Sequence, residues 1–471
     1  MALQPKQLHR ALIRHRPVSL PSLRPLSTLY AKIDTAPQTI TGSQGNYLYT
    51  RDGKSIFDAS AGASVVSVGH NDPRVKQAIV EQLDRVAFTY NPFFTTPAVE
   101  QLAQLLTHST NGEMSKVFFV SSGTEAVEAA LKMARQYFTE LPTPQPNRTR
   151  FIARKQSYHG NTLGSLATGY HAARRKVYEP ILATNISHVS PCYAYRNMKA
   201  GETEEQYVAR LADELDREFQ AVGPETVCAF VAETVSGTSL GCVPPVRGYF
   251  KAMKQVCDRH GALLIMDEVM SGMGRTGYLH AWEEEGVVPD LQTVAKGLGS
   301  GYLPIGALLV NKRVADAFSQ GTGAFVHSQT YQAHPLACAA SYAVQKIIEE
   351  DNLLANTREN GAYLGRLLQE RLGGHENVGD IRGRGLFWAI EFVRNKATKE
   401  PFPPKDQLAA RIHKTGLQPE YGVSVIPASG NINGVDGDLI IISPPLIVTK
   451  DEVDLVVSKI EAVLDAVLGK Q

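Results

Sequence analysis

The chain has 471 residues, which is enough for two or three domains with a sizeable core. Its 48 lysines and arginines nearly balance its 47 aspartates and glutamates, which argues against nucleic acid or an anionic membrane as the main partner. The longest apolar runs, such as "ALLIM" at 262–266, are far too short to span a bilayer. Five scattered cysteines without a Cys-x-x-Cys pair indicate a reducing compartment and give no zinc signature. We therefore expect a soluble intracellular enzyme without a metal site.

Residues 1–33 differ in composition from the rest of the chain. The segment carries several serines, and the first acidic residue is Asp34. It also holds four arginines, at Arg10, Arg14, Arg16 and Arg24. This composition is typical of a mitochondrial transit peptide, and a disordered basic arm is the alternative. We expect a mitochondrial location, with the cytoplasm as the alternative, and leave this segment out of the fold prediction.

From about residue 35 the sequence alternates between strand-like and helix-like segments. Helical patterns at 124–138 and 204–219 separate short apolar runs that end in polar or glycine-rich turns, among them "KVFFVSSG", "TVCAFVAET", "ALLIMDEV" and "DLQTVAKG". This alternation predicts an α/β fold with a largely parallel sheet and helices on both faces. Ligands of such sheets bind beyond the carboxyl ends of the strands. After about residue 340, long amphipathic helices and "VGDIRGRGLFWAIEFV" indicate a separate α+β unit.

Three of the predicted strand ends carry residues that could bind one ligand. Ser122, Gly123 and Thr124 lie between a strand and a helix, where backbone N–H groups and hydroxyls can bind phosphate, although an ordinary helix cap looks similar. Asp267 ends a buried strand, where a carboxylate needs a cation or serves as a structural ion pair. Lys296 ends the next strand-like run, where a lysine can also simply extend to solvent. Pyridoxal phosphate combines a phosphate, a basic ring nitrogen and an aldehyde that reacts with lysine. The three strand ends together therefore predict this cofactor.

Ordered motifs from about residue 45 to 465 carry a resemblance to a known family. They are "AGASVVSVGHNDPRV", "SSGTEAVEAALKMAR", "SYHGNT", "LLIMDEVMSGMGRTG", "AKGLGSGYLPIGALLV", "HSQTYQAHPLACAA", "IRGRGLFWAIEF" and "ISPPLIVT". In this order the sequence resembles the class III, or omega-type, aminotransferases of fold type I, which depend on pyridoxal phosphate. The resemblance implies an N-terminal segment at 34–75 that packs with the small domain. It also implies a large cofactor-binding domain at 76–340 and a small C-terminal domain at 341–471.

The resemblance also implies roles for single residues. Lys296 would form the Schiff base with the cofactor. The phosphate would bind to Ser122, Gly123 and Thr124 and, from the neighbouring subunit, to Thr330, which implies a homodimer with shared active sites.

The cofactor ring would have its own set of contacts. Asp267 would pair with the ring nitrogen, and Tyr158 and Val269 would pack on the two ring faces. His159 and Glu233 would surround Asp267, although ordinary capping or core hydrogen bonds are the alternative for both.

The implied reaction moves an amino group from an amine or omega-amino acid to a 2-oxo acid such as pyruvate. Lys296 would be both the anchor and the acid/base group, because a neutral amine in a desolvated pocket can remove the substrate proton. An aminomutase or a decarboxylase of the same family shares every cofactor residue and is the nearest alternative. A catalytically silent binding protein is less favoured, because Asp267 and Lys296 are both present.

Substrate-binding positions depart from the family pattern. The arginines that bind a substrate carboxylate are replaced by Ile441, Pro427 and Asn161, and Thr238 stands where ornithine-type members have an acid. Arg384, or backbone N–H groups of the loop 427–438, are the candidate substitutes.

An apolar pocket for the amine is also predicted. Ser64 stands where related enzymes often have a bulky ring, and Phe88, Tyr90, Phe93 and Phe94 supply aromatic side chains, with core packing as the alternative.

Overall fold

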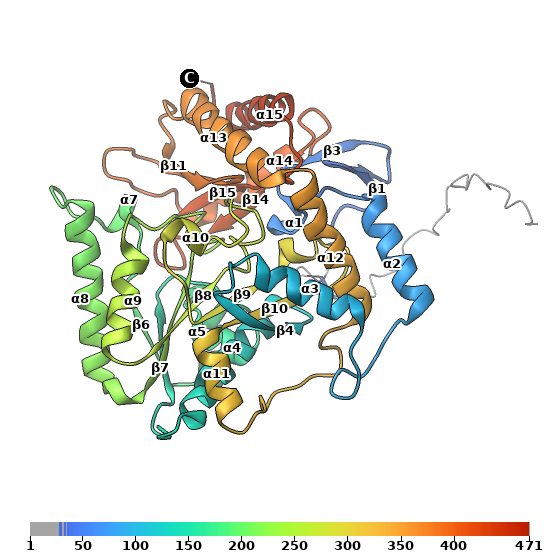
Figure 1. Ribbon diagram of the computed structural model, residues 1–471. Helices are drawn as coiled ribbons and strands as arrows, with labels where there is room; N and C mark the ends of the chain where they lie inside the picture. The colour runs from blue at the N-terminus through green and yellow to red at the C-terminus, as the bar shows by residue number, and fades with distance from the viewer. Residues whose placement is uncertain (1–27, 31–32, 34, 471) are drawn as a thin grey trace, which may run out of the picture.

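The protein is described here by a computed structural model that covers residues 28–30, 33 and 35–470 (Figure 1). Most of the segment 1–33, including the four arginines on which the transit-peptide prediction depends, lies outside the described residues. Within the described part of the chain, no helix combines the length and the apolar character that crossing a membrane requires.

A seven-stranded sheet forms the centre of the molecule, with the strand order β4-β10-β9-β8-β7-β5-β6. Neighbouring strands are parallel except at β10, which is antiparallel to both β4 and β9. The strands are β4 (Met114–Val120), β5 (Arg150–Arg154), β6 (Ile186–Val189), β7 (Val227–Glu233), β8 (Leu263–Asp267), β9 (Leu291–Val294) and β10 (Gly306–Asn311). The predicted α/β fold with a mostly parallel sheet is therefore confirmed.

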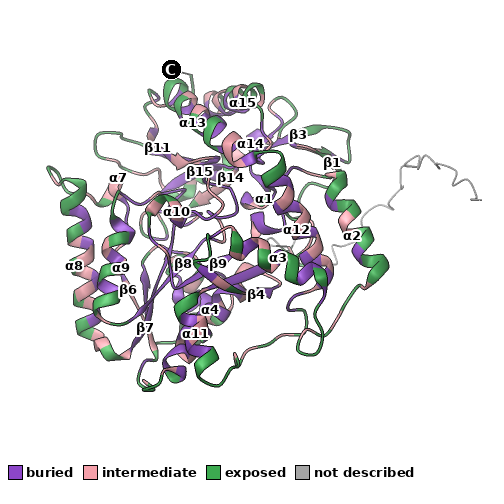
Figure 2. Ribbon diagram, viewed as in Figure 1, coloured by how far each residue is buried: buried purple, intermediate pink, exposed green. Residues whose placement is uncertain are grey.

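Helices cover both faces of this sheet. The predicted helices are present as α4 (Gly123–Glu140) and α8 (Glu204–Val222), and Thr203 and Gln206 form a capping box that starts α8. Successive residues of a strand point to opposite faces. In β8, Leu264 and Met266 pack with α8 and α9 (Tyr249–Arg259), whereas Leu263 and Ile265 pack with α4 and α11 (Lys312–Gln320). Figure 2 shows the result, with buried central strands between helices whose outer faces are exposed.

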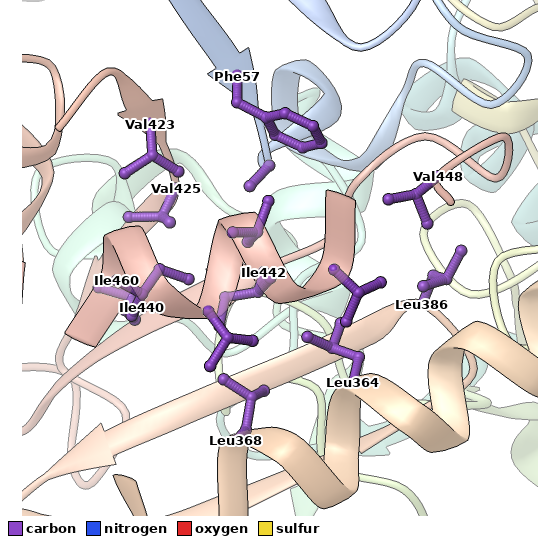
Figure 3. Close-up of a cluster of buried hydrophobic side chains, with 14 of the residues drawn as sticks. Phe57, Leu364, Leu368, Leu386, Val423, Val425, Ile440, Ile442, Val448 and Ile460 are labelled. Atoms are coloured by element: carbon purple, nitrogen blue, oxygen red, sulfur yellow. The ribbon is translucent and has the colours of Figure 1, made fainter. Parts of the chain in front are cut away.

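The C-terminal part of the chain forms a second sheet with helices on it. The strands β11 (Val378–Arg384), β12 (Phe387–Phe392), β15 (Asp438–Ile442) and β14 (Ile426–Ser429) are antiparallel in that order. The helices α13 (Leu353–Leu372), α14 (Leu408–Gly416) and α15 (Lys450–Leu468) pack against it. A cluster of buried side chains fills this unit, and Figure 3 labels Phe57, Leu364, Leu368, Leu386, Val423, Val425, Ile440, Ile442, Val448 and Ile460 from it.

The N-terminal strands belong to the same hydrophobic cluster. The strands β1 (Ile40–Gln44), β2 (Tyr47–Thr50) and β3 (Ser55–Asp58) form a sheet that β13 (Val423–Ser424) completes by pairing in parallel with β3. The remaining α-helices are α1 (Ala61–Ser64), α2 (Pro73–Arg85), α3 (Pro97–His108), α5 (Leu163–Thr168), α6 (Ala172–Arg175), α7 (Ala194–Asn197), α10 (Trp282–Glu285) and α12 (Pro335–Glu350).

A buried arginine ties the two halves of the molecule together. The Arg275 guanidinium donates hydrogen bonds to the carbonyl oxygens of Leu386, Pro444 and Val66. Burial lowers the pKa of Arg275 to about 10, and carbonyl dipoles from three separate segments solvate its charge. The large sheet and the C-terminal unit are thereby fixed around the edge of the sheet where the polar strand ends meet.

Candidate active site

The carboxyl ends of three parallel strands bring polar side chains into one row. In the register of the sheet, Glu233 at the end of β7 lies beside Asp267 at the end of β8, and Asp267 lies beside Thr293 of β9. Lys296 follows β9 at the same edge of the sheet. A cavity of about 580 Å³ opens here, and its lining includes Glu233, Asp267 and Lys296. The predicted strand ends therefore line one cavity.

Asp267 is a buried carboxylate with three hydrogen-bond donors. His159 Nδ1 lies 2.7 Å from its Oδ2, while the Thr293 hydroxyl at 3.1 Å and the Val269 N–H at 3.0 Å both donate to Oδ1. The side chain is 5% exposed. These hydrogen bonds fix the orientation of the carboxylate at the cavity wall, where it can pair with a cationic ligand atom.

Lys296 projects into the cavity from a strained backbone. Its φ of 44° lies in the left-handed region, which an unbranched non-glycine residue occupies at a cost and which clusters at functional sites. Burial lowers the pKa of Lys296 to about 8. The negative charges of Asp267 and Glu233 oppose this decrease, and the positive charges of Arg275 and Arg174 add to it. Among the described residues, no acceptor lies within hydrogen-bond distance of its ammonium group. The amine is therefore positioned in the cavity without a partner and titrates near neutral pH.

A helix N-terminus forms another wall of the cavity. Ser122 is the N-cap of α4, Gly123 and Thr124 open the helix, and all three residues line the cavity. The first N–H groups of a helix have no helical acceptor and favour an anion. The Thr124 hydroxyl lies 2.9 Å from that of Thr162 and accepts a hydrogen bond from its N–H at 3.2 Å, so its position is fixed.

Glycines keep the backbone close together around this helix start. A Cβ on Gly123 would lie 2.7 Å from Val269 Cγ1, and one on Gly160 would lie 2.2 Å from the Thr124 hydroxyl oxygen. Gly160 also has a φ of 126°, which other residues rarely adopt. A Cβ at either position would therefore force Val269 or Thr124 away from the start of α4.

Tyr158, His159 and Glu233 form the part of the cavity wall next to Asp267. All three line the cavity, and the Nε2 atom of His159 is buried without a hydrogen-bond partner among the described residues. Glu233 accepts hydrogen bonds from the N–H groups of Gly237 at 3.0 Å and Tyr158 at 3.4 Å. Burial raises the pKa of Glu233, which His159 and Arg154 oppose.

These features fit pyridoxal phosphate. The opened helix start can bind the phosphate, the fixed carboxylate can bind a protonated ring nitrogen, and the unpartnered amine can bond to the aldehyde. Val269 and Tyr158, which both line the cavity, could enclose the ring between them.

Within a single chain, several residues that were expected in the substrate pocket do not line the cavity. Ser64 is buried and donates to the Ser443 hydroxyl at 2.8 Å, while its neighbour Val65 lines the cavity instead. Arg384 pairs with Glu285 at 2.7 Å and Glu284 at 3.2 Å beside a different cavity. The structure therefore does not bring Arg384 to the site as a substitute for the missing arginines.

The loop 427–438 does not line the cavity either. Five of its N–H groups bond within the loop itself: Gly430 to Gly437, Ile432 to Asp436, Gly434 to Gly430, and Val435 and Asp436 to the Asn433 side chain. Pro427 lies in β14, and Ile441 is buried in β15. Of the positions that depart from the family pattern, only Asn161 and Thr238 line the cavity.

The expected aromatic residues and Thr330 lie on the surface of the chain. Phe88, Tyr90, Phe93 and Phe94 are 41%, 42%, 75% and 64% exposed, and none of them lines the cavity. Thr330 is exposed as well. Core packing is therefore not their role, and within one chain they do not complete the site.

Two residues at the site were not predicted from the sequence. Thr293, which donates to Asp267, could have been suspected because it is a polar residue inside the apolar run of β9. Arg174 places its guanidinium 4.7 Å from the centroid of the Tyr158 ring. Only the fold of the segment between β5 and β6 brings this arginine to Tyr158, so the sequence carried no signal for it.

The fold and this site define a transferase of the pyridoxal-phosphate type. The sequence pattern of the class-III aminotransferases matches residues 30–464. An aminotransferase from Gibberella zeae is 50% identical over 442 residues, which cover 94% of this chain and 86% of the relative. A probable mitochondrial gamma-aminobutyrate transaminase 3 of Oryza sativa subsp. indica is 36% identical, with coverage of 93% and 84%.

A solved structure agrees with these relatives. The PLP-bound amine transaminase from an uncultivated Pseudomonas species superposes with a TM-score of 0.86 at 34% identity, covering 96% of this chain and 100% of that one. The chain belongs to the class III aminotransferases, and the resemblance noted in the sequence is confirmed.

Proposed function

We propose that the protein is a pyridoxal-phosphate-dependent transaminase that moves an amino group from an amine or omega-amino acid to a 2-oxo acid such as pyruvate. The observation that carries this proposal is the pair formed by an unpartnered Lys296 and a triply hydrogen-bonded Asp267 in one cavity. Lys296 would hold the cofactor through its aldehyde, Asp267 through its ring nitrogen, and Ser122, Gly123 and Thr124 through its phosphate.

When bound, pyridoxal phosphate supplies an aldehyde that takes up the amino group and a ring that accepts an electron pair. Lys296 supplies the proton transfer. With a pKa of about 8, roughly a quarter of its amine is neutral at pH 7.5 and can act as a base. Asp267 is held in place by hydrogen bonds from His159, Thr293 and the Val269 N–H.

Substrate choice is supported by the relatives and by the cavity wall. The rice relatives are named as gamma-aminobutyrate transaminases and the structural neighbour as an amine transaminase, so omega-amino acids and simple amines are the donors to test first. Apolar groups from Val65, Val235 and Met270 line the cavity and suit the carbon chain of such a donor.

We further propose a homodimer in which Thr330 reaches the phosphate of the neighbouring subunit. Exposed aromatic rings lie next to it, since Tyr331 is 61% exposed and its ring centroid is 5.9 Å from that of Phe88. The adjoining Phe93 and Phe94 are also exposed. Contiguous exposed apolar surface of this kind marks an interaction site, and a second copy of the chain is the occupant that we propose.

We propose a mitochondrial location on the composition of residues 1–33 and on the mitochondrial relatives. A fluorescent fusion of the full chain, compared with a fusion that begins at residue 34, tests this. The full fusion should enter mitochondria and the shortened one should not, and equal distributions would contradict the proposal.

The test of the reaction is a screen of amine donors against pyruvate and 2-oxoglutarate, with both products identified by mass. Transamination gives an aldehyde or ketone from the donor and an amino acid from the acceptor in equal amounts. Release of carbon dioxide, or an isomer of the donor without use of the acceptor, would instead identify a decarboxylase or an aminomutase. The Lys296→Ala variant is the control, because it keeps the cavity but lacks the proton-transferring amine.

A further inference from the structure

A transaminase that accepts a 2-oxo acid needs a cation for the substrate carboxylate. No arginine lines the cavity, and Lys296 is its only cationic residue among those described. Lys296 is already required for proton transfer under the proposed function. A bare carboxylate in a partly apolar cavity is costly without a partner, so within one chain the binding charge has to come from a side chain that moves in.

Arg174 is a cation that lies beside a residue of the cavity wall. It lies on α6, and its guanidinium stacks 4.7 Å from the centroid of Tyr158, which lines the cavity. In the described part of the chain, no carboxylate or other acceptor lies within bonding distance of this guanidinium. Its charge contributes to the lowered pKa of Lys296, so the two groups already interact electrostatically.

The neighbouring residue Arg175 has a different environment. Its guanidinium donates hydrogen bonds to the carbonyl oxygens of Leu166, Ala167 and Gly169. These contacts fix α6 on the preceding helix. Arg175 is therefore structural, whereas the exposed side chain of Arg174 is free to turn.

The loop 427–438, whose sequence departs from the family pattern, also contacts α6. Gly434 has a φ of 88°, and a Cβ there would lie 2.3 Å from the Cβ of Ala172, so the loop backbone is in contact with the start of α6. The Gln156 side chain holds the loop by donating to the carbonyls of Asn431, at 2.7 Å, and Ile432. The segment that lacks the family's arginine at Pro427 thus positions the helix that carries Arg174.

We propose that Arg174 binds the carboxylate of the 2-oxo acid and of the amino acid formed from it, moving from the Tyr158 ring into the cavity. A guanidinium can hold a carboxylate by two parallel hydrogen bonds and can stack on an aromatic ring when the site holds an uncharged substrate. The substrate class assigned to this position is therefore a short 2-oxo monocarboxylate, alternating with an amine that has no carboxylate. This inference rests on the proposed transaminase function.

The test compares pyruvate with propanal, which has the same carbon chain and no carboxylate, as acceptors from the same amine donor. In Arg174→Gln, kcat/KM for pyruvate should fall about ten- to a hundred-fold, mainly through KM, as expected for loss of a charge-assisted pair. The value for propanal should stay within about two-fold, and Arg174→Lys should recover part of the loss. Lys176→Gln, which removes an exposed cation from the same segment, is the matched control and should change neither acceptor.

The outcomes separate the two proposals. Equal losses for pyruvate and propanal would mean that Arg174 only supports Tyr158, and an unchanged pyruvate value would mean that another group binds the carboxylate. Either result overturns the inference and leaves the transaminase proposal intact. If the wild-type protein transfers no amino group to any acceptor, the proposed function fails, and the inference fails with it.

Discussion

The environment of Lys296 predicts that this lysine destabilises the cofactor-free protein. Its pKa is lowered by burial from 10.5 to about 8, so below pH 8 the folded chain holds a charge that it solvates poorly. The unfolded chain holds the same charge in water. Between these two pKa values the unfolded state binds more protons, so the free energy of unfolding should rise with pH across this window.

Replacing Lys296 with methionine removes the charge and keeps an unbranched side chain of similar volume. A shift from 10.5 to about 8 corresponds to a penalty of about 3 kcal/mol at pH 7, falling to about half of that at pH 9.5. The cofactor-free Lys296→Met protein should therefore be more stable than the cofactor-free wild type by about this amount at pH 7, with a smaller difference at pH 9.5.

Denaturant titrations of the two cofactor-free proteins at equal concentration, at several pH values from 7 to 9.5, measure this difference. Lys312→Met is the matched control, because Lys312 is an exposed lysine that pairs with Asp316 on the surface, and its loss should change stability by less than about 0.5 kcal/mol. A Lys296→Met protein that is less stable than wild type at pH 7, or a difference that does not shrink with pH, would refute the reasoning. It would mean that the amine is well solvated and is not prepared for proton transfer.

Three further substitutions test the site. Asp267→Asn should slow the proton transfer on the order of a hundred- to a thousand-fold and should weaken cofactor retention, because a neutral partner no longer holds the ring nitrogen protonated. An unchanged single-turnover rate would contradict this prediction. Thr293→Val removes one of the three donors to Asp267 with little change in shape and should lower cofactor affinity about ten-fold in an absorbance titration, whereas equal affinity would show that the hydroxyl is dispensable. Thr330→Val should lower cofactor affinity about ten- to a hundred-fold in the homodimer. In a heterodimer of a Lys296→Ala chain with a Thr330→Val chain, the one competent site should keep wild-type affinity, and weak binding there would place Thr330 in its own subunit.

The central sheet and the polar strand ends could be predicted because their signals are local. The runs that end in Asp267 and Lys296 alternate with amphipathic helices, and parallel strands bring their carboxyl ends to one edge. The single antiparallel strand β10 could not be distinguished, because a buried strand reads as the same apolar run in either direction.

Substrate-binding residues were harder to predict because their contacts link distant parts of the chain. By residue type, Arg384 could bind an anion. It instead forms an ion pair at 2.7 Å with Glu285, which is 99 positions away in the sequence. Arg174 and Tyr158 come together only through the folded segment around α6. Residue type and position at the strand ends therefore predicted residues that line the cavity, such as Asp267 and Lys296, while charge pairing across the fold decided that Arg384 is not free.

The parallel pairing of β3 with β13 has a consequence for how the chain folds during synthesis. Ser424 ends β13 and Ser60 lies just after β3; their hydroxyl oxygens are 3.1 Å apart, although the two residues are 364 positions apart in the sequence. At ordinary ribosomal rates the second of these residues emerges on the order of 20–70 s after the first. During that interval β3 has an open edge, and its side chain Phe57 has no completed cluster to enter. The pairing of β3 with β13 must therefore form late, after the large domain has been made, although the local pairs β1–β2 and β2–β3 can form earlier.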